Sequence, residues 1–229
     1  MHTMQASTTQ SAPQADQSSV WAEHYATGSG FRRWPCEELV RAVGDRQFGT
    51  VLEVGCGNGA NLWFLAEHAQ WVVGVDGYAP AASVARGYVL GRRGKDNVTV
   101  REGDIRSLDI ADGTVDAVVD VMVSQHVGWQ EHWALYREYR RVLRPGGWLF
   151  LYHLSEGTTT VGDEAEAFTW ARVPMFPQVT PFCLPPAWAL AGAVRRAGFE
   201  VTDASVRGMT RWYPGGHTAH YTVIEGEAR

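Results

Sequence analysis

Segments with strand and helix patterns alternate along most of this chain, and that alternation constrains the fold more than any other feature. The short apolar runs that predict buried strands are 50–55, 71–76, 97–104, 115–123 and 148–153. The segments with helical spacing of apolar residues are 35–43, 60–69, 79–91 and 130–143. Strands that alternate with helices form a mostly parallel sheet covered on both faces, so we expect a Rossmann-like α/β fold.

This rhythm breaks after the last of these strands. Residues 155–184 are rich in Pro, Thr and aromatic residues and are long for a connection, so we expect an insertion that forms a substrate wall. A helix is predicted at about 185–197. The patterns of 199–208 and 217–227 predict a closing antiparallel hairpin with a long turn between its strands.

We expect a single domain over residues 20–229, with an N-terminal cap at 20–47. Residues 1–19 are polar and rich in Ser, Thr and Gln, which predicts a disordered tail without the pattern of a signal peptide. The apolar stretch 188–194 is too short to span a bilayer, so no membrane partner is expected.

Charge and cysteine content exclude several classes of protein. The formal net charge is −5 and no dense Lys/Arg block occurs, which argues against a nucleic-acid partner. Cys36, Cys56 and Cys183 are scattered, so they form neither a disulfide framework nor a CxxC metal site. We therefore expect a cytoplasmic protein. The oligomeric state is left open.

A glycine-rich turn, "EVGCGNGAN" at 53–61, follows the first predicted strand. Gly55, Gly57 and Ala60 match the G-x-G-x-x-G/A turn of nicotinamide dinucleotide sites. Glu53 together with the glycines at 55, 57 and 59 also matches the E/D-x-G-x-G-x-G turn of enzymes that use S-adenosylmethionine. Both cofactors use the turn for close backbone approach and for its N–H donors, so the turn alone does not decide between them.

Carboxylates at the ends of successive strands favour the second cofactor. Glu53, Asp76 and Asp104 each lie at the C-terminal end of a predicted strand, and ligands bind at that edge of a parallel sheet. Three carboxylates repel the charges of a pyrophosphate. They suit a cofactor that carries a sulfonium, an ammonium and an adenine amino group. A nicotinamide-dependent reductase remains the rival from another enzyme class.

At this point the chain resembles the class I S-adenosylmethionine-dependent methyltransferase family, in particular its small-molecule, ubiquinone-biosynthesis-like members. The segments that carry the resemblance are "VLEVGCGNGAN", "VVGVDGY", "REGDI", "VDAVVDVMVSQHV" and "RVLRPGGWLFLYH". The resemblance implies S-adenosyl-L-methionine as cofactor and methyl transfer to O or N of a small molecule, for which we favour a specialised metabolite. A sugar or nucleotide-sugar methyltransferase and a non-catalytic S-adenosylmethionine-binding regulator are the alternatives.

The resemblance also implies roles for individual residues. Glu53 is expected to orient the cofactor ammonium, Asp76 to hold the ribose, and Asp104 to accept from the adenine amino group. Asp120 departs from the small residue that is usual at its position. The residues assigned in this way to the cofactor site are Glu53, Gly55, Cys56, Gly57, Asn61, Asp76, Gly77, Tyr78, Asp104, Ile105, Asp120 and Val121.

The N-terminal segment 21–35 mixes aromatic residues, glycines and two arginines, as a cap over the cofactor requires. Tyr25 is predicted to close over the methionine end. Arg32 or Arg33 is predicted to pair with its carboxylate, and we assign Arg33. The alternative is a solvated basic turn in which Phe31 and Trp34 pack as core.

Methyl transfer requires alignment and exclusion of water, and it requires a base only where the nucleophile must lose a proton. His126 follows the fourth predicted strand and His153 ends the fifth, so both are candidate bases, with packing as the alternative for each. His217 and His220 are expected on opposite faces of a strand, and no metal site is expected. The aromatic residues of the insertion either wall the substrate or pack: Phe168, Trp170, Phe176 and Phe182.

Overall fold

The protein is described from a computed structural model. The structure describes residues 21, 24–25, 31–92, 94–161, 168, 170–176 and 181–229, with the backbone alone at residue 92. The expected tail at 1–19 lies outside the described residues, as do parts of the expected cap and insertion.

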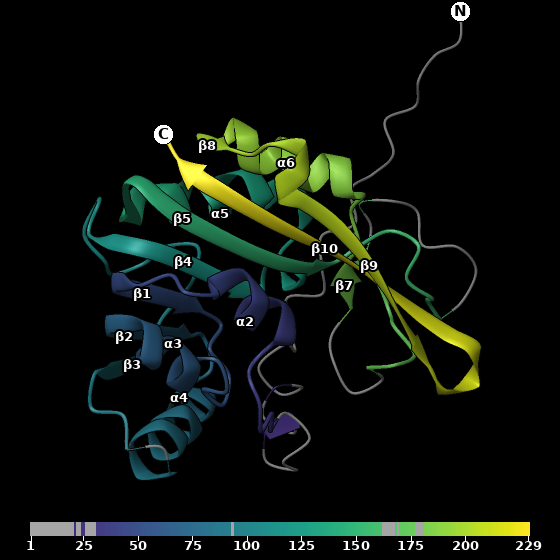
Figure 1. The fold of residues 1–229 in the computed structure, drawn as a ribbon. Coiled ribbons are helices and arrows are strands. Elements are labelled where there is room, and N and C mark those ends of the chain that lie inside the picture. The colour runs from purple at the N-terminus through teal and green to yellow at the C-terminus, as the bar shows by residue number, and fades with distance from the viewer. Residues whose placement is uncertain are drawn as a thin grey trace, which may run out of the picture.

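A central sheet organises the described residues, with strand order β3-β2-β1-β4-β5-β10-β8 and β9 paired to β10 (Figure 1). The strands β1 to β5 run parallel, whereas β10 pairs antiparallel with β5, β8 and β9. The predicted fold class is confirmed. The strands are β1 Phe48–Val54, β2 Ala69–Asp76, β3 Val98–Glu102, β4 Val115–Val121, β5 Leu143–Leu154, β8 Phe199–Glu200, β9 Val206–Tyr213 and β10 His217–Ala228.

Helices cover both faces of this sheet, with α2, α3 and α4 on one side and α5 and α6 on the other (Figure 1). A hydrophobic core lies on each face of the sheet, and alternate residues of a strand belong to different cores. In β5, Phe150 and Tyr152 pack with α2, α3 and α4, whereas Leu149 and Leu151 pack with α5 and α6. The helices are α2 Glu37–Val43, α3 Leu62–His68, α4 Ala79–Arg86 continued by a π-helical segment Gly87–Arg92, α5 Trp129–Val142 and α6 Ala187–Arg196.

The C-terminal hairpin differs from its prediction. β9 continues to Tyr213, and the turn is the tight segment Pro214–Gly216, so the expected long turn is wrong. Met209 and Tyr213 pack against the core from alternate positions of β9, which explains why this part of the chain extends as strand. Phe199–Glu200 pairs with the far end of β10 and is not the hairpin partner.

Within the insertion, the described residues contain a short antiparallel pair, β6 Trp170–Ala171 with β7 Phe182–Cys183. Phe182 is buried in the core on the α2 side of the sheet, and Phe176 packs against that core. Among the residues that the structure describes, no helix has the length and apolar character needed to cross a membrane.

Candidate functional site

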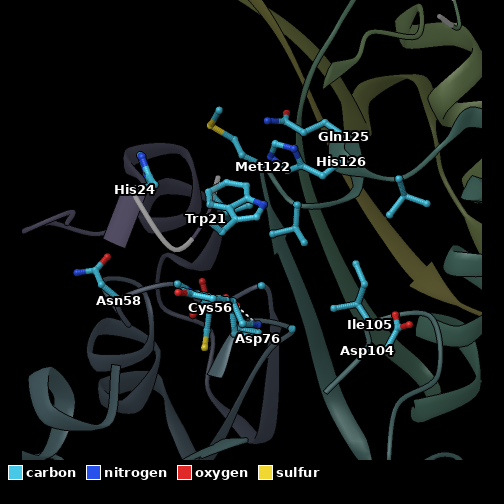
Figure 2. A pocket seen from close by; sticks show the side chains of 18 of the residues that line it. Trp21, His24, Cys56, Asn58, Asp76, Asp104, Ile105, Met122, Gln125 and His126 are labelled. Atoms are coloured by element: carbon cyan, nitrogen blue, oxygen red, sulfur yellow. Dashed lines mark hydrogen bonds between the residues drawn. The ribbon is translucent and has the colours of Figure 1, made fainter. Parts of the chain in front are cut away.

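A cavity of about 880 Å³ lies where the parallel strands β1 to β4 end. Figure 2 shows residues from separate elements around it, with Cys56 and Asp76 at one end and Gln125 and His126 at the other. The described residues that line it are Trp21, His24, Tyr25, Arg32, Glu53, Gly55, Cys56, Gly57, Asn58, Ala60, Asn61, Asp76, Gly77, Tyr78, Glu102, Gly103, Asp104, Ile105, Arg106, Val121, Met122, Val123, Gln125, His126, Val127, Gly128, Glu131, Trp170, Phe176 and Phe182.

The glycine-rich turn forms the floor of this cavity. Gly55 and Gly57 have φ values of 57° and 54°, a left-handed conformation that favours glycine. A Cβ atom on Gly55 would overlap Val123, and one on Gly57 would lie 2.7 Å from the Tyr25 hydroxyl oxygen. Glycine is therefore required at both positions, because the backbone conformation and the close approach of Val123 and Tyr25 exclude a side chain.

Glu53 lines the cavity and has one carboxyl oxygen without a hydrogen-bond partner among the described residues. Its side chain is 2% exposed, and Oε1 accepts a hydrogen bond of 2.7 Å from Asn61 Nδ2. The Cys36 N–H donates to Asn61 Oδ1 at 2.8 Å, which fixes the orientation of that amide. Glu53 Oε2 has no hydrogen-bond partner among the described residues, and burial raises the Glu53 pKa to about 8. A cationic donor in the cavity would satisfy this oxygen.

Asp76 is held by the backbone at the end of β2. Oδ2 accepts from the Gly57 N–H at 2.8 Å and Oδ1 from the Tyr78 N–H at 3.0 Å. Burial raises the pKa of Asp76, and these two hydrogen bonds oppose that rise. Each carboxylate oxygen accepts one bond here and retains a second lone pair, so the group can accept two further donors such as a pair of hydroxyls.

Asp104 is already paired with a cation. The Arg106 guanidinium donates to it through Nη2 at 2.8 Å and through Nε at 3.0 Å. This hydrogen-bonded guanidinium holds the pKa of Asp104 below its usual range. Asp104 and Ile105 both line the cavity (Figure 2). The expected contact of Asp104 with an adenine amino group therefore involves a carboxylate that Arg106 also holds, and it stays a prediction.

Arg32, rather than Arg33, belongs to the cavity. The Arg32 N–H donates to Asn58 Oδ1 at 3.2 Å, and Asn58 Nδ2 donates back to the Arg32 carbonyl at 2.7 Å. This reciprocal pair anchors Arg32 on the glycine-rich turn. Arg33 is exposed, and its guanidinium lies 5.7 Å from the centre of the Trp34 ring, outside the cavity lining. The assignment of Arg33 is therefore wrong, and the other predicted candidate, Arg32, lines the cavity.

The same segment contradicts the alternative of a packed core turn. Phe31 is 42% exposed and Trp34 is 62% exposed. Tyr25, in contrast, lines the cavity and stacks near Tyr78 with ring centres 6.0 Å apart.

Asp120 does not reach the cavity. Its fully buried carboxylate accepts from the Val123 N–H at 3.1 Å and from the Tyr139 hydroxyl of α5 at 3.1 Å. Burial raises the pKa of Asp120 to about 6. Val121 lines the cavity as expected, so its neighbour in the strand must face the opposite side. Asp120 is assigned to the cofactor site from the sequence with no role given to its side chain, and this side chain lies outside the cavity lining.

Of the two candidate bases, only His126 lines the cavity. The His126 ring lines the cavity, lies 5.1 Å from the Trp21 ring in an edge-on arrangement, and lies 4.9 Å from the Phe182 ring. Burial lowers the pKa of His126 to about 3, so the imidazole is neutral at physiological pH.

His153 faces the other side of the sheet. It is fully buried, its Nε2 lies 3.3 Å from Nε2 of His132 on α5, and its Nδ1 contacts the Leu154 carbonyl. Burial lowers its pKa to about 3. His153 does not line the cavity, so the prediction that it faces the ligand is wrong.

Sequence reasoning missed several lining residues. Trp21, Asn58 and Met122 line the cavity, and so does Gln125, which is fully buried. Gln125 is adjacent to His126 in the sequence, and this adjacency to a candidate base was the one available signal. Among the described residues, no group of three or more His, Cys, Asp or Glu side chains is arranged to hold a metal ion.

Comparison with known proteins finds similarity to methyltransferases. Residues 51–147 match the family model described as a methyltransferase domain. A 2-heptyl-1-hydroxyquinolin-4(1H)-one methyltransferase of Mycobacteroides abscessus is 38% identical over 87 residues, which cover 38% of this chain and 38% of that protein. Nocamycin O-methyltransferase of Saccharothrix syringae is 27% identical over 234 residues, covering 89% of this chain and 82% of that protein.

The solved structures agree on the fold. A SAM-dependent methyltransferase from Methanosarcina mazei superposes with a TM-score of 0.63 at 17% identity, covering 84% of this chain and 98% of that one. The chain spans 35% to 38% of the length of the first curated relatives that it matches.

The match over residues 51–147 is to a methyltransferase domain, and the fold of the chain is that of the solved SAM-dependent methyltransferases. The cofactor that this family implies is S-adenosyl-L-methionine, and the rival nicotinamide cofactor is set aside. The residues present fit that cofactor, because the unpaired Glu53 Oε2 needs a cationic donor and Glu53 lines a cavity of about 880 Å³.

Proposed function

We propose that this protein transfers the methyl group of S-adenosyl-L-methionine to an oxygen or nitrogen atom of a small molecule. The observation that carries the proposal is the buried, unpaired Oε2 of Glu53 in the lining of a cavity with room for a second molecule. Arg32 brings a guanidinium to the same lining, and Asp76 brings an oriented carboxylate. An ammonium, a carboxylate and a ribose provide partners for these three groups.

The bound cofactor would supply an activated methyl group on a sulfonium. The part of this chain is to orient both molecules and to exclude water from the reacting atoms. Glu53, Asp76 and Arg32 would hold the cofactor, while the rings of Trp21 and Phe182 close the space around His126.

His126 is proposed to take the proton that the acceptor's nucleophile loses. Its neutral imidazole has an unprotonated nitrogen at physiological pH, because burial keeps its pKa at about 3. The same low pKa makes it a weak base, so its contribution should fall at the lower end of the range for general-base catalysis, about a hundredfold.

A specialised metabolite is the acceptor that we favour. The two relatives named above methylate a hydroxyquinolone and nocamycin according to their names, and the latter match spans most of both chains. The insertion contributes Trp170, Phe176 and Phe182 to the cavity lining, which suits a planar or apolar body. A nucleotide-linked sugar is less suited, because the Arg106 guanidinium, which could contact its phosphates, is already paired with Asp104 and Glu131. We place the enzyme in the cytoplasm, where free thiols such as those of its three cysteines persist.

Two measurements test this proposal. Isothermal titration calorimetry should detect binding of S-adenosylmethionine and of S-adenosylhomocysteine, with no comparable binding of NAD or NADP. Incubation with isotope-labelled S-adenosylmethionine and a panel of phenols, hydroxyquinolones and amines should then give a labelled product by mass spectrometry. Binding without transfer to any panel member would favour a non-catalytic binding protein, and binding of NAD alone would refute the family's cofactor for this chain.

A further inference from the structure

Gln125 presents an unused hydrogen-bond donor at the end of the cavity away from the glycine-rich turn. Its side chain is fully buried and lines the cavity, and its Nε2 has no hydrogen-bond partner among the described residues. Figure 2 shows Gln125 and His126 at the same end of the site, away from Cys56 and Asp76. A buried amide donor without a partner is unfavourable, so such a group indicates a ligand atom that completes it.

The orientation of the Gln125 amide is fixed by the backbone. The Leu154 N–H donates to Gln125 Oε1 at 2.9 Å. A backbone N–H can only donate, so the atom that faces it must be the amide oxygen and the remaining atom must be the NH₂ group. The atom of this lining residue that lacks a partner is therefore a donor, and its partner must be an acceptor atom.

The residues around Gln125 indicate what kind of molecule carries this acceptor atom. The aromatic wall, which consists of Trp21, His126, Phe176 and Phe182, lies at this end of the cavity, and its rings contact one another at centroid distances between 4.9 and 5.9 Å. His126 is neutral, so the wall carries no charge. Such a wall favours the flat face of an uncharged ring system.

We propose that Gln125 Nε2 donates a hydrogen bond to an oxygen of the acceptor molecule, and that the site therefore selects planar, uncharged acceptors that carry a carbonyl or other accepting oxygen. This inference rests on the proposed function, and it makes Gln125 a specificity-determining residue. An acceptor with the same ring body but without the oxygen would leave the buried amide unpaired, and sites built around a hydrogen bond reject such analogues.

The test compares 1-indanone with indane, two probes that differ by one carbonyl oxygen. Each is titrated into the complete protein saturated with S-adenosylhomocysteine, and binding is followed by tryptophan fluorescence and checked by calorimetry. The wild type should prefer 1-indanone by about tenfold, the effect of one buried hydrogen bond. Because the preference is a ratio measured on one protein, a general loss of packing in a variant cancels from it.

Three variants assign the donor. Gln125→Met keeps the length of the side chain, removes the donor and should abolish the preference. Gln125→Glu keeps an oxygen for the Leu154 N–H. It should lose the preference at alkaline pH, where a carboxylate cannot donate, and regain it at acidic pH, where the protonated carboxyl can. His126→Phe should retain the preference.

Defined results overturn the proposal. Equal affinities of the wild type for the two probes, or no binding of either up to its solubility, would exclude selection for an oxygen. If the preference is retained in Gln125→Met and lost in His126→Phe, the donor is His126 and not Gln125. A protein that fails to bind S-adenosylhomocysteine would refute the proposed function itself, whereas equal probe affinities in a protein that binds it would refute this inference alone.

Discussion

Cofactor binding should release a proton from Glu53, and this linkage gives a quantitative test of the site. In the free protein burial raises the Glu53 pKa to about 8, so at about pH 6.5 the carboxyl is almost fully protonated. An ammonium placed at Oε2 favours the carboxylate. The α-amino group of the ligand has a pKa of about 8 and stays protonated in the same range, so it does not take up the proton. The bound state therefore holds about one proton fewer than the free protein and ligand.

The sign and size of the pH effect follow from this difference. Because binding releases a proton, affinity should increase as the pH rises toward the pKa of Glu53. Between about pH 6 and pH 7 the dissociation constant of S-adenosylhomocysteine should fall by about tenfold. Calorimetry in two buffers with different ionisation enthalpies measures the proton release directly, and we expect close to one proton per ligand at about pH 6.5.

Glu53→Gln is the matched control for this linkage. Its side-chain oxygen still accepts from Asn61 Nδ2, but it offers an amide in place of a carboxylate to the ammonium. The variant should release no proton and should show little pH dependence. At about pH 8 it should bind about tenfold to over a hundredfold more weakly, because hydrogen bonds to charged groups contribute about 1.5–3 kcal/mol. The same proton release in wild type and variant would refute the role of Glu53.

Further predictions concern the other lining residues. Asp76→Ala should weaken cofactor affinity by about tenfold to several-hundredfold in calorimetry, since charge-assisted hydrogen bonds of about 2–4 kcal/mol in total are lost; an unchanged affinity in a folded variant would show that the ribose is held elsewhere. Arg32→Ala should weaken cofactor binding while the matched Arg33→Ala does not, because only Arg32 lines the cavity; equal effects would contradict the assignment. His126→Gln should lower turnover by about a hundredfold with nearly constant cofactor affinity. In the wild type, the acid limb of the rate–pH profile should lie far below neutral pH, because the pKa of His126 is about 3. An unchanged rate in the variant would show that His126 only packs. His153→Gln should leave turnover intact. Because the folded pKa of His153 lies at about 3, below its ordinary value, its contribution to stability is present at neutral pH and lost as the pH falls below about 6.5. The variant should therefore reduce the slope of the unfolding free energy against pH, between about pH 4 and 6, by about 1.4 kcal/mol per pH unit in denaturant titrations.

The sequence was sufficient for the sheet and the glycine-rich turn, because both follow from local patterns. Apolar runs of strand length predict buried strands, and the glycines at 55 and 57 predict a tight turn with positive φ values. The structure contains both. Glu53 and Asp76 were found for the same reason. Each follows a strand pattern, and the ends of parallel strands meet at one edge.

The directions of individual side chains were harder to predict. Asp120 and His153 lie near the correct edge of the sheet, but their side chains face the wrong side. Asp120 precedes Val121, which lines the cavity, and His153 follows Tyr152, which belongs to the core on the α2 side. Successive strand residues face opposite sides, so applying the two-residue period to Val121 and Tyr152 would have excluded both. Arg32 and Gln125 required contacts between distant segments, such as those of Arg32 with Asn58 and Gln125 with Leu154, which no local pattern reveals.

A crystal structure of the protein with S-adenosylhomocysteine tests the central claim most directly. The account predicts that the ligand's amino nitrogen lies about 2.7–3.2 Å from Glu53 Oε2 and that its ribose hydroxyls donate to Asp76. A ligand bound elsewhere, or bound in this cavity with Glu53 Oε2 still unpaired, would contradict the account.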